Sequence, residues 1–468
     1  MIAVLKPYPE YKESGLPWLG RIPSHWKLLR SRYLFREVDE RSIKGEETRL
    51  SMSQQHGLIR SSRINEHRLV SETQVGAKIC AAGYLVLNRL KAHLGVFALA
   101  SEQGLVSPDY TVLRPIRNLE ARYFEAFYRT PVCRGELYRR AKGIVEGFWR
   151  LYTDDYYDIH APVPNTNEQV AILKFLDHAN GRLLRAIRAK RKVIALLNEQ
   201  KQAIIHRAVT RGLDPSVPLK PSGIPWLGDI PQHWEVMPLK RTCSLVRDGT
   251  HLPPARTLTG FPLLSVRNMV GGRLVRRADD SFISKADFEQ LNSSFVVRPN
   301  DVLMAIVGAT LGKVAVVDDI GPFQIQRSVS ILRSRSEHMS HEFLATFLRS
   351  PRLQQHLWQS VAFSAQPGIY LGFIANIPVP VPPTIAEQVS ICDGLQRELS
   401  PIVTAISRLE REIELLHEYR TRLVADVVTG KLDVREAAAR LPEEDAPDPV
   451  EDIDVSDETE PADEEAAA

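Results

Sequence analysis

Two long segments of the chain place apolar residues at alternating intervals of three and four. In the first, seven of the ten positions with this spacing are apolar: Leu173, Leu176, Asn180, Leu183, Ile187, Lys190, Ile194, Leu197, Lys201 and Ile204. In the second, nine of the ten are apolar: Cys392, Leu395, Leu399, Ile402, Ile406, Leu409, Ile413, Leu416, Arg420 and Leu423. A heptad pattern kept over about five heptads predicts two long helices of the coiled-coil type. We expect their contact seam to be centred on Leu183, Ile187, Ile194, Leu197, Ile402, Ile406, Leu409 and Ile413.

Each helical segment belongs to one copy of a repeated unit. Residues 14–26 (SGLPWLGRIPSHW) and 222–234 (SGIPWLGDIPQHW) are identical at ten of thirteen positions. The helical segments open with VPNTNEQV at 163–170 and VPPTIAEQV at 381–389, and close with VTRGLD at 209–214 and VTGKLD at 428–433. Such self-similarity indicates two copies of one structural unit. Because Trp18, Trp26, Trp226 and Trp234 recur in both copies, we expect them to pack a shared framework.

The stretches between these landmarks are more weakly related. Residues 84–114 align on 301–331, with Gly95 opposite Gly312 and Gly104 opposite Gly321. Short β-branched runs between glycines predict strands and turns. We therefore predict two mixed α/β globular domains separated by long coiled-coil helices, with an internal pseudo-two-fold repeat. The predicted boundaries are 1–162, 163–214, 215–380, 381–433 and an acidic disordered tail at 434–468.

The repeat also predicts how the helices meet. Two halves related by a two-fold axis require antiparallel helices, and at 1.5 Å per residue each would run about 60 Å, enough to hold two domains at a fixed separation. Asn180 either fixes the register of the seam or is a tolerated polar residue near the helix start. Residues Tyr11 to His25 are expected to lie against the second helix and so complete the symmetry.

Charge is unevenly distributed along the chain. The net charge is +3, but residues 442–468 hold thirteen acidic residues and no Lys or Arg. The preceding 441 residues therefore carry 60 basic against 44 acidic residues. This balance favours a polyanionic partner such as nucleic acid.

The cysteines and the apolar runs exclude several classes of protein. Cys80, Cys133, Cys243 and Cys392 are far apart and form no C-x-x-C pair, which argues against a zinc ribbon or a disulfide framework. The amino terminus lacks a signal-peptide pattern, and the longest apolar stretch, 302–317, is too short to span a bilayer. We expect a soluble cytoplasmic protein.

Sequence signatures of catalysis are not convincing. Residues 308–314 (GATLGKV) resemble a phosphate-binding loop, but one residue is missing between the glycines and Val314 replaces the Ser or Thr that would bind magnesium. Acidic pairs such as Asp154–Asp155 and Asp318–Asp319 are typical of solvated turns. We predict no catalytic residue and no metal site.

Side chains that can read DNA are nevertheless present in both domains. Arg and Lys pair with guanine, Asn and Gln pair with adenine, and hydroxyls and cations contact phosphates. The candidates in the first domain are Arg60, Arg63, Arg89, Lys91, His93, Ser107, Tyr110, Trp149 and Arg150. Those in the second are Arg267, Asn268, Thr310, Lys313, Gln324, Gln326, Arg327, Gln366 and Tyr370.

These motifs together resemble a known family. The carriers are P-W-L-G-x-I-P-x-H-W at 17–26 and 225–234, the E-Q entry to each long helix, and the phrases GLVSPDYTVLRP (104–115) and DVLMAIVGATLGKVAVV (301–317). In their sequences and in their order along the chain, these motifs resemble those of the specificity subunits of type I restriction–modification systems, from Tyr11 to about Asp433.

The resemblance implies a non-catalytic subunit with two target recognition domains that read a bipartite site in double-stranded DNA. It implies two methyltransferase (modification) subunits and restriction (motor–nuclease) subunits as partners, which would bind S-adenosylmethionine, ATP and magnesium. Two alternatives remain: a coiled-coil adaptor that binds only proteins, and a stand-alone DNA enzyme with a cryptic site.

Overall fold

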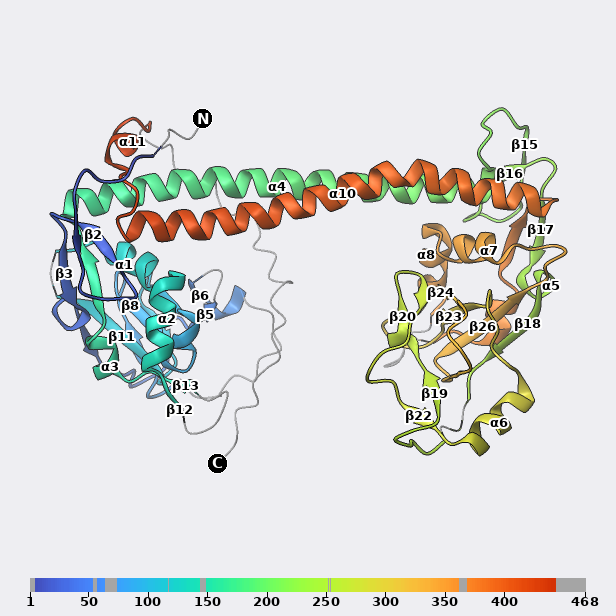
Figure 1. Ribbon diagram of the computed structural model, residues 1–468, viewed down its shortest axis with the longest axis horizontal. Helices are drawn as coiled ribbons and strands as arrows, with labels where there is room; N and C mark the ends of the chain where they lie inside the picture. Colours follow the sequence, from blue (N-terminus) through green and yellow to red (C-terminus); the bar gives the residue numbers. More distant parts are fainter. Residues whose placement is uncertain are drawn as a thin grey trace. The chain divides into compact units, whose positions relative to one another are not determined.

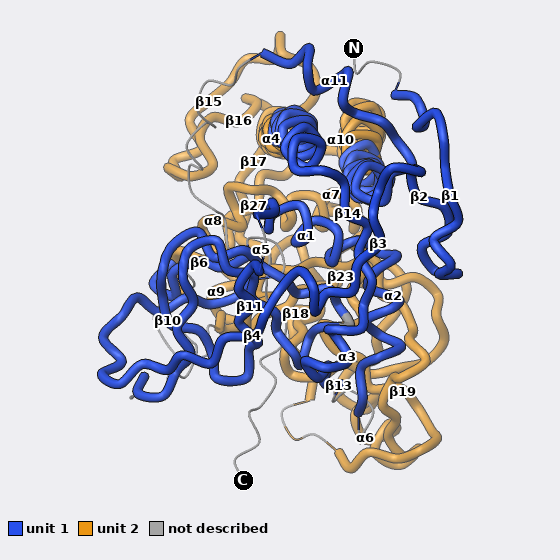
Figure 2. Tube along the Cα trace, turned by 90° about the vertical axis from the view of Figure 1, so that its left-hand side faces the viewer, with its two compact units in different colours: residues 1–189, 412–468 blue, residues 190–411 orange. Residues whose placement is uncertain are grey.

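The computed structural model describes residues 5–53, 57–63, 74–116, 118–143, 149–250, 252, 254–361 and 368–442. The chain divides into two compact units, unit 1 (residues 1–189 and 412–468) and unit 2 (residues 190–411). The division falls within both long helices, α4 (Thr166–Arg211) and α10 (Ile385–Val428), as Figure 2 shows by colour. Each long helix therefore begins in one unit and ends in the other.

Unit 1 is built on an antiparallel sheet of order β4–β11–β8–β9 (Figure 1). Its strands are β4 (Phe35–Val38), β11 (Tyr110–Pro115), β8 (Leu85–Asn88) and β9 (Phe97–Leu99). Two-stranded pairs join β1 (Tyr11–Glu13) to β2 (Arg21–Pro23), β3 (Lys27–Arg30) to β14 (His160–Val163), β5 (Leu50–Ser53) to β6 (Gly57–Arg60), β7 (Lys78–Cys80) to β10 (Gly104–Val106) and β12 (Lys142–Gly143) to β13 (Trp149–Arg150). The shorter helices are α1 (Ala121–Tyr128), α2 (Pro131–Arg140), α3 (Thr153–Tyr157) and α11 (Arg435–Ala439), with 3-10 helices η1 (Ser31–Tyr33), η2 (Ser61–Arg63) and η3 (Arg89–Leu94). The prediction of a disordered tail from residue 434 is therefore wrong at its start, because Val434 and Ala438 are buried in the core of unit 1.

Unit 2 is built on a sheet of order β18–β26–β23–β24–β21–β20, in which only the β21–β24 pair is parallel. Its strands are β18 (Cys243–Asp248), β26 (Val329–Ser334), β23 (Val302–Ala305), β24 (Val314–Val316), β21 (Arg273–Leu274) and β20 (Met269–Val270). A second sheet of order β22–β19–β25 holds β22 (Phe282–Ile283), β19 (Phe261–Leu264) and β25 (Gln324–Ile325), and two pairs join β15 (Leu219–Pro221) to β16 (Asp229–Pro231) and β17 (Glu235–Pro238) to β27 (Pro378–Val381). The shorter helices are α5 (Leu239–Thr242), α6 (Lys285–Ser294), α7 (His341–Leu348), α8 (Pro351–Gln359) and α9 (Leu371–Ala375), with 3-10 helix η4 (Val266–Asn268).

The two units repeat one framework, as the sequence predicted. The strand order β4–β11–β8–β9 recurs as β18–β26–β23–β24, and the hairpin β1–β2 recurs as β15–β16. Helix α2 and its counterpart α8 both have proline near the start, where the missing N–H costs no hydrogen bond. The mixed α/β fold with an internal repeat is therefore confirmed.

A buried tryptophan and a glutamate join the hairpin of each unit to a long helix. In unit 1, the indole Nε1 of Trp26 donates to Glu168 at 3.0 Å, and the Tyr8 hydroxyl donates to the same oxygen at 2.8 Å. In unit 2, Trp234 donates to Glu387 at 2.8 Å. Both indoles are fully buried, so each N–H depends on a carboxylate acceptor within the protein. The predicted framework role of these two tryptophans is confirmed.

The glutamine that follows each glutamate joins the long helix to a shorter helix of the same unit. The Gln169 side-chain carbonyl accepts the backbone N–H of Glu120, the N-cap of α1, at 2.9 Å. Gln388 accepts the backbone N–H of Ser340, the N-cap of α7, at 2.7 Å. The repeated Glu-Gln dipeptide thus joins three elements in each unit.

The long helices pair through the predicted seam. In unit 1 the first turns of α4 share a core with the last turns of α10, and in unit 2 the last turns of α4 share a core with the first half of α10, so the pairing is antiparallel. Leu183, Ile187 and Ile402 are buried, while Ile194, Leu197, Ile406, Leu409 and Ile413 are half-buried. The polar seam residues Asn180 and Arg420 meet in unit 1, where Arg420 Nε donates to Asn180 Oδ1 at 3.1 Å. Within the described residues, no helix is both long and apolar enough to cross a membrane.

The amino-terminal segment packs against the end of α10, as predicted for Tyr11 to His25. The Tyr11 hydroxyl donates to the Lys431 carbonyl at 3.1 Å, and the backbone N–H of Asp433 donates to the Lys6 carbonyl at 2.8 Å. Gly430 has φ +79°, and a Cβ there would lie 2.4 Å from the Pro23 side chain. Only glycine allows this close approach.

The four cysteines are unpaired. Burial raises the pKa of each thiol, to about 12 for Cys243 and about 11 for Cys392. They act as small apolar residues at neutral pH.

Replacing Glu168 with alanine should lower the free energy of unfolding by about 3 kcal/mol, because Trp26 Nε1 and the Tyr8 hydroxyl lose their buried acceptor. Glu387→Ala should cost about 1 kcal/mol, since that side chain is less buried and water can replace it. Urea unfolding followed by tryptophan fluorescence measures both. Glu436→Ala, at an exposed ion pair, is the control; equal losses in all three variants would contradict the assignment.

The pair at the seam should behave as a coupled unit. Asn180→Leu alone should destabilise the chain by about 1–2 kcal/mol, because Arg420 keeps its charge and loses its acceptor. The double variant Asn180→Leu/Arg420→Leu should recover that loss through apolar packing. A double-mutant cycle of thermal unfolding tests this, and additive effects would show that the two residues are independent.

Candidate nucleic-acid interface

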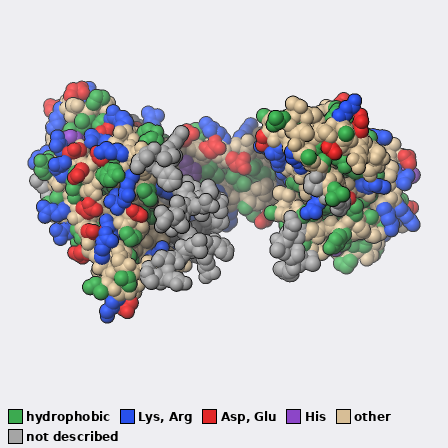
Figure 3. Space-filling model, turned by 90° about the horizontal axis from the view of Figure 1, so that it is seen from below, with side chains coloured by type: hydrophobic (Ala, Val, Ile, Leu, Met, Phe, Trp, Pro, Cys, Tyr) green, Lys and Arg blue, Asp and Glu red, His purple; other side chains and the backbone are tan. Residues whose placement is uncertain are grey.

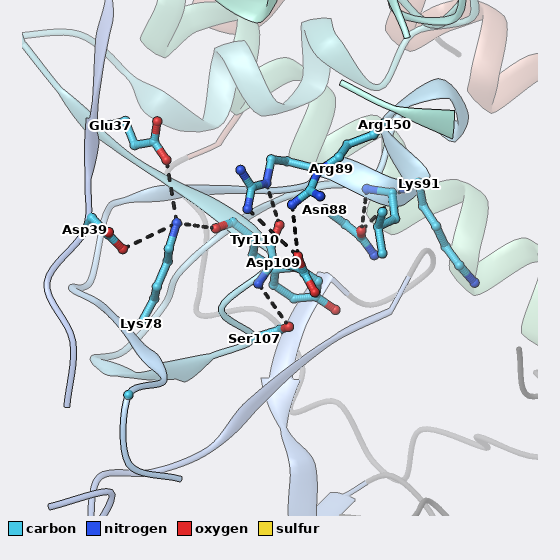
Figure 4. A network of polar contacts seen from close by, with 12 residues as sticks. Glu37, Asp39, Lys78, Asn88, Arg89, Lys91, Ser107, Asp109, Tyr110 and Arg150 are labelled. Carbon is cyan, nitrogen blue, oxygen red and sulfur yellow. Dashed lines mark hydrogen bonds and ion pairs between the residues drawn. The ribbon is translucent and has the colours of Figure 1, made fainter. Parts of the chain in front are cut away.

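Asp109 accepts hydrogen bonds from two of the predicted DNA-reading arginines in unit 1 (Figure 4). It lies in the turn between β10 and β11, and its backbone N–H donates to the Ser107 hydroxyl at 3.3 Å. Arg89 Nε donates to the Asp109 carbonyl at 2.7 Å, and Arg150 donates to the Asp109 carboxylate at 3.1 Å. The turn thus holds two guanidinium groups from distant parts of the sequence beside each other.

The local sequence explains where Arg89 and Lys91 lie. Asn88 ends strand β8, and its side-chain oxygen caps η3 by accepting the N–H groups of Leu90 and Lys91 at 3.1 and 3.3 Å. The Arg89 carbonyl accepts the N–H of Leu151, which fixes strand β13 and with it Arg150. Short side-chain caps of this kind stabilise turns at element ends.

A buried lysine, Lys78, contacts the residue that follows Asp109 in the same turn. Lys78 Nζ donates to the Tyr110 carbonyl at 3.0 Å and lies 3.5 Å from both Glu37 and Asp39. Burial opposes ionisation of Asp39, but Arg41 and Lys78 outweigh it and hold its pKa below the usual range. Sequence reasoning missed Lys78, although it is the single charged residue between positions 74 and 88.

The other unit 1 candidates lie apart from this turn or in different pairs. Arg60 forms a bidentate pair with Glu102 at 2.8 and 2.6 Å, and Arg63 is an exposed residue at the end of η2. Trp149 packs against Tyr138 with ring centroids 5.3 Å apart. His93 belongs to η3, and its side chain lies outside the described part of the chain.

In unit 2, three candidate segments converge at the end of strand β23. The backbone N–H of Ile306 donates to the Ser328 carbonyl, and that of Ile369 donates to the Ile306 carbonyl, both at 2.9 Å. These bonds bring the turn of Gln326 and Arg327 beside the loop that carries Tyr370. The segment with exposed Thr310 and Lys313 continues directly from β23.

Burial removes two unit 2 candidates from the surface. Asn268 and Gln324 are each 1% exposed. The Asn268 amide donates to Asp280 at 2.6 Å, and the Gln324 amide donates to Asn292 and to the Phe295 carbonyl at 2.8 Å. We therefore leave both out of the interface proposed below, because polar groups used inside a domain are not presented to bases.

The remaining predictions have separate outcomes. Arg267 is a surface residue that pairs with Asp279 at 2.9 Å. Gln366 lies outside the described residues. Across the described ranges, no group of three or more His, Cys, Asp or Glu is placed to hold a metal ion.

On the face that Figure 3 shows, basic side chains occur in both units. These Lys and Arg side chains lie among hydrophobic and acidic side chains in each unit. Such a mixed surface is consistent with DNA contacts made by a few side chains held in fixed positions.

One family model matches the chain. Residues 234–415 match the type I restriction modification DNA specificity domain. The match begins at Trp234 of the repeated hairpin and covers the unit 2 globular domain and most of α10.

Curated relatives match a larger part of the chain. It is 24% identical over 285 residues to the type I restriction enzyme MjaVIII specificity subunit of Methanocaldococcus jannaschii, covering 60% of this chain and 64% of that protein. It is 24% identical over 298 residues to the EcoBI specificity subunit of Escherichia coli, covering 58% and 62%. The chain thus spans less than two thirds of the length of these relatives.

A solved structure shares the fold. That structure comes from work described as the structural basis underlying complex assembly and conformational transition of the type I R-M system. It matches with a TM-score of 0.64 at 17% identity and covers 88% of this chain and 99% of that one.

Asp109→Asn should raise affinity for random duplex DNA while lowering discrimination between a preferred and a random duplex by roughly tenfold. Removing a negative charge strengthens phosphate attraction, but Arg150 loses its orienting partner. Fluorescence anisotropy at fixed salt measures both affinities. Asp158→Asn, which breaks a similar surface pair with Arg32, is the matched control; the same ratio in both variants would rule out an orienting role.

Proposed function

We propose that this chain is a type I restriction–modification specificity subunit, a non-catalytic protein that reads a bipartite sequence in double-stranded DNA. Each globular domain would read one part. The family match, the specificity-subunit relatives and the shared fold support this proposal together.

One observation carries the proposal: the framework is repeated and the candidate surfaces are not. Both units use the same Trp–Glu and Gln–N-cap hydrogen bonds. The equivalent turns before β11 and β26, by contrast, present Ser107 and Asp109 in unit 1 and Gln326 and Ser328 in unit 2. Different donors and acceptors on one scaffold are what two different half-sites require.

We further propose which residues make the contacts. In unit 1 they are Arg89, Lys91, Ser107, Tyr110 and Arg150, which Figure 4 shows together. In unit 2 they are Thr310, Lys313, Gln326, Arg327 and Tyr370. Direct base contacts from a few of these would specify sequence, and the remaining polar groups would position the duplex through phosphates.

Methyltransferase and restriction subunits are the proposed protein partners. The paired helices α4 and α10 would serve as spacer and as docking surface for the methyltransferase subunits. In this proposal S-adenosylmethionine, ATP and magnesium belong to those partners, which would supply the methylation and cleavage chemistry.

The experiment is methylation mapping of genomic DNA from cells that express this chain with its methyltransferase partner. A bipartite methylated motif should be present, and it should vanish when this chain is omitted. Exchanging residues 301–331 for those of another specificity subunit should change one half of the motif. Methylation that is unchanged without the chain, with an active methyltransferase present, would refute the proposal and favour a protein-only adaptor.

A further inference from the structure

Each unit exposes an aliphatic side chain in the loop that follows the edge strand of its main sheet. Ile43, after β4, is 89% exposed, and Leu252, after β18, is 86% exposed. Single exposed aliphatic residues are common on protein surfaces. Their recurrence at one structural position in two diverged domains calls for an explanation.

The strand register shows that the two positions are equivalent. Leu113 of β11 pairs with Glu37 of β4, and Leu332 of β26 pairs with Val246 of β18. On their other sides, these two leucines pair with the first residues of β8 and β23. Ile43 and Leu252 each follow the paired edge-strand residue by six positions.

A local hydrogen bond is formed beside each of the two aliphatic residues. The Ser42 hydroxyl oxygen accepts the N–H of Gly45 at 2.7 Å and donates to Glu47 at 2.6 Å. The Thr250 hydroxyl donates to the Leu252 carbonyl at 2.7 Å. The hydrogen bond of Ser42 spans Ile43, and that of Thr250 ends on Leu252 itself.

Both loops also lie beside the candidate DNA-reading turns. Arg41 pairs with Lys78, whose amine donates to the Tyr110 carbonyl. Thr250 pairs with Gln326. Ile43 comes two positions after Arg41, which makes the bridge in unit 1. Leu252 comes two positions after Thr250, which makes the bridge in unit 2.

We propose that Ile43 and Leu252 read thymine, each by packing against a thymine 5-methyl group in the major groove of its half-site. The inference rests on the proposed function and names a specificity contact within it. The thymine methyl is the one apolar group among base edges in that groove, and aliphatic side chains recognise it by excluding water. The adjacent turns carry polar side chains, Ser107 in unit 1 and Gln326 in unit 2, which favour DNA over a protein partner as the occupant.

The test uses the full chain with its methyltransferase subunits and duplexes in which deoxyuridine replaces one thymine at a time. Wild-type protein should lose about fourfold in affinity when the contacted methyl is removed from the half-site read by unit 2. Leu252→Ser should show that loss on the intact duplex and no further loss on the substituted one. Ile43→Ser should do the same for the other half-site only.

Leu258→Ser is the matched control. Leu258 lies in the same loop as Leu252 and is 96% exposed, but its neighbour Thr257 pairs with Phe282 instead of the candidate turn. This variant should keep wild-type affinity and the full fourfold response to deoxyuridine. The same loss as in Leu252→Ser would overturn the assignment.

Two further results would overturn the inference while leaving the proposed function intact. One is a wild-type protein that prefers its bipartite site yet responds to no thymine replacement. The other is a Leu252→Ser variant with unchanged DNA binding that retains less methyltransferase, which would assign the residue to protein docking. Failure of the proposed function itself is distinct, because the wild-type chain would then not prefer the bipartite duplex over a scrambled one.

Discussion

The buried carboxylate at the start of each long helix is the interaction on which the rest of the structure depends. Glu168 and Glu387 accept the indole N–H of a fully buried tryptophan, which has no other acceptor among the described residues. The neighbouring glutamine extends the same anchor to the N-cap of a helix in the globular domain, α1 in unit 1 and α7 in unit 2. Hairpin, long helix and globular domain are therefore held together by two adjacent side chains.

This arrangement keeps the anchors apart from the candidate recognition turns. The anchors lie at the end of each unit where the long helix begins, whereas the turns that differ between the units follow strands β10 and β25. Substitutions in those turns leave the tryptophan–glutamate contact unchanged. One scaffold can then carry Asp109 with its two arginines in unit 1 and Gln326 with Arg327 in unit 2. Divergence of the surface does not require divergence of the core.

The sequence predicted the features that depend on spacing and repetition. The heptad intervals identified the seam, and the recurrence of Trp26 and Trp234 identified the framework, because both signals lie within short stretches of chain. Features that depend on distant segments could not be predicted. Nothing local shows that Arg89 and Arg150 share Asp109, or that Trp26 meets Glu168, 142 positions away. Asn268 and Gln324 resembled surface readers because polarity alone does not reveal that a side chain is buried.

The two units differ in how the chain builds them, and this has a consequence for synthesis on the ribosome. Unit 2 is one continuous segment, whereas unit 1 needs both ends of the chain, since Lys6 pairs with Asp433 and Tyr123 donates to the Val428 carbonyl. At about 5–20 residues per second, the stretch from residue 190 to residue 433 takes roughly 10 to 50 seconds to emerge from the ribosome. During that time the apolar start of α4 lacks its α10 partner. The nascent chain thus completes unit 2 before unit 1 can close.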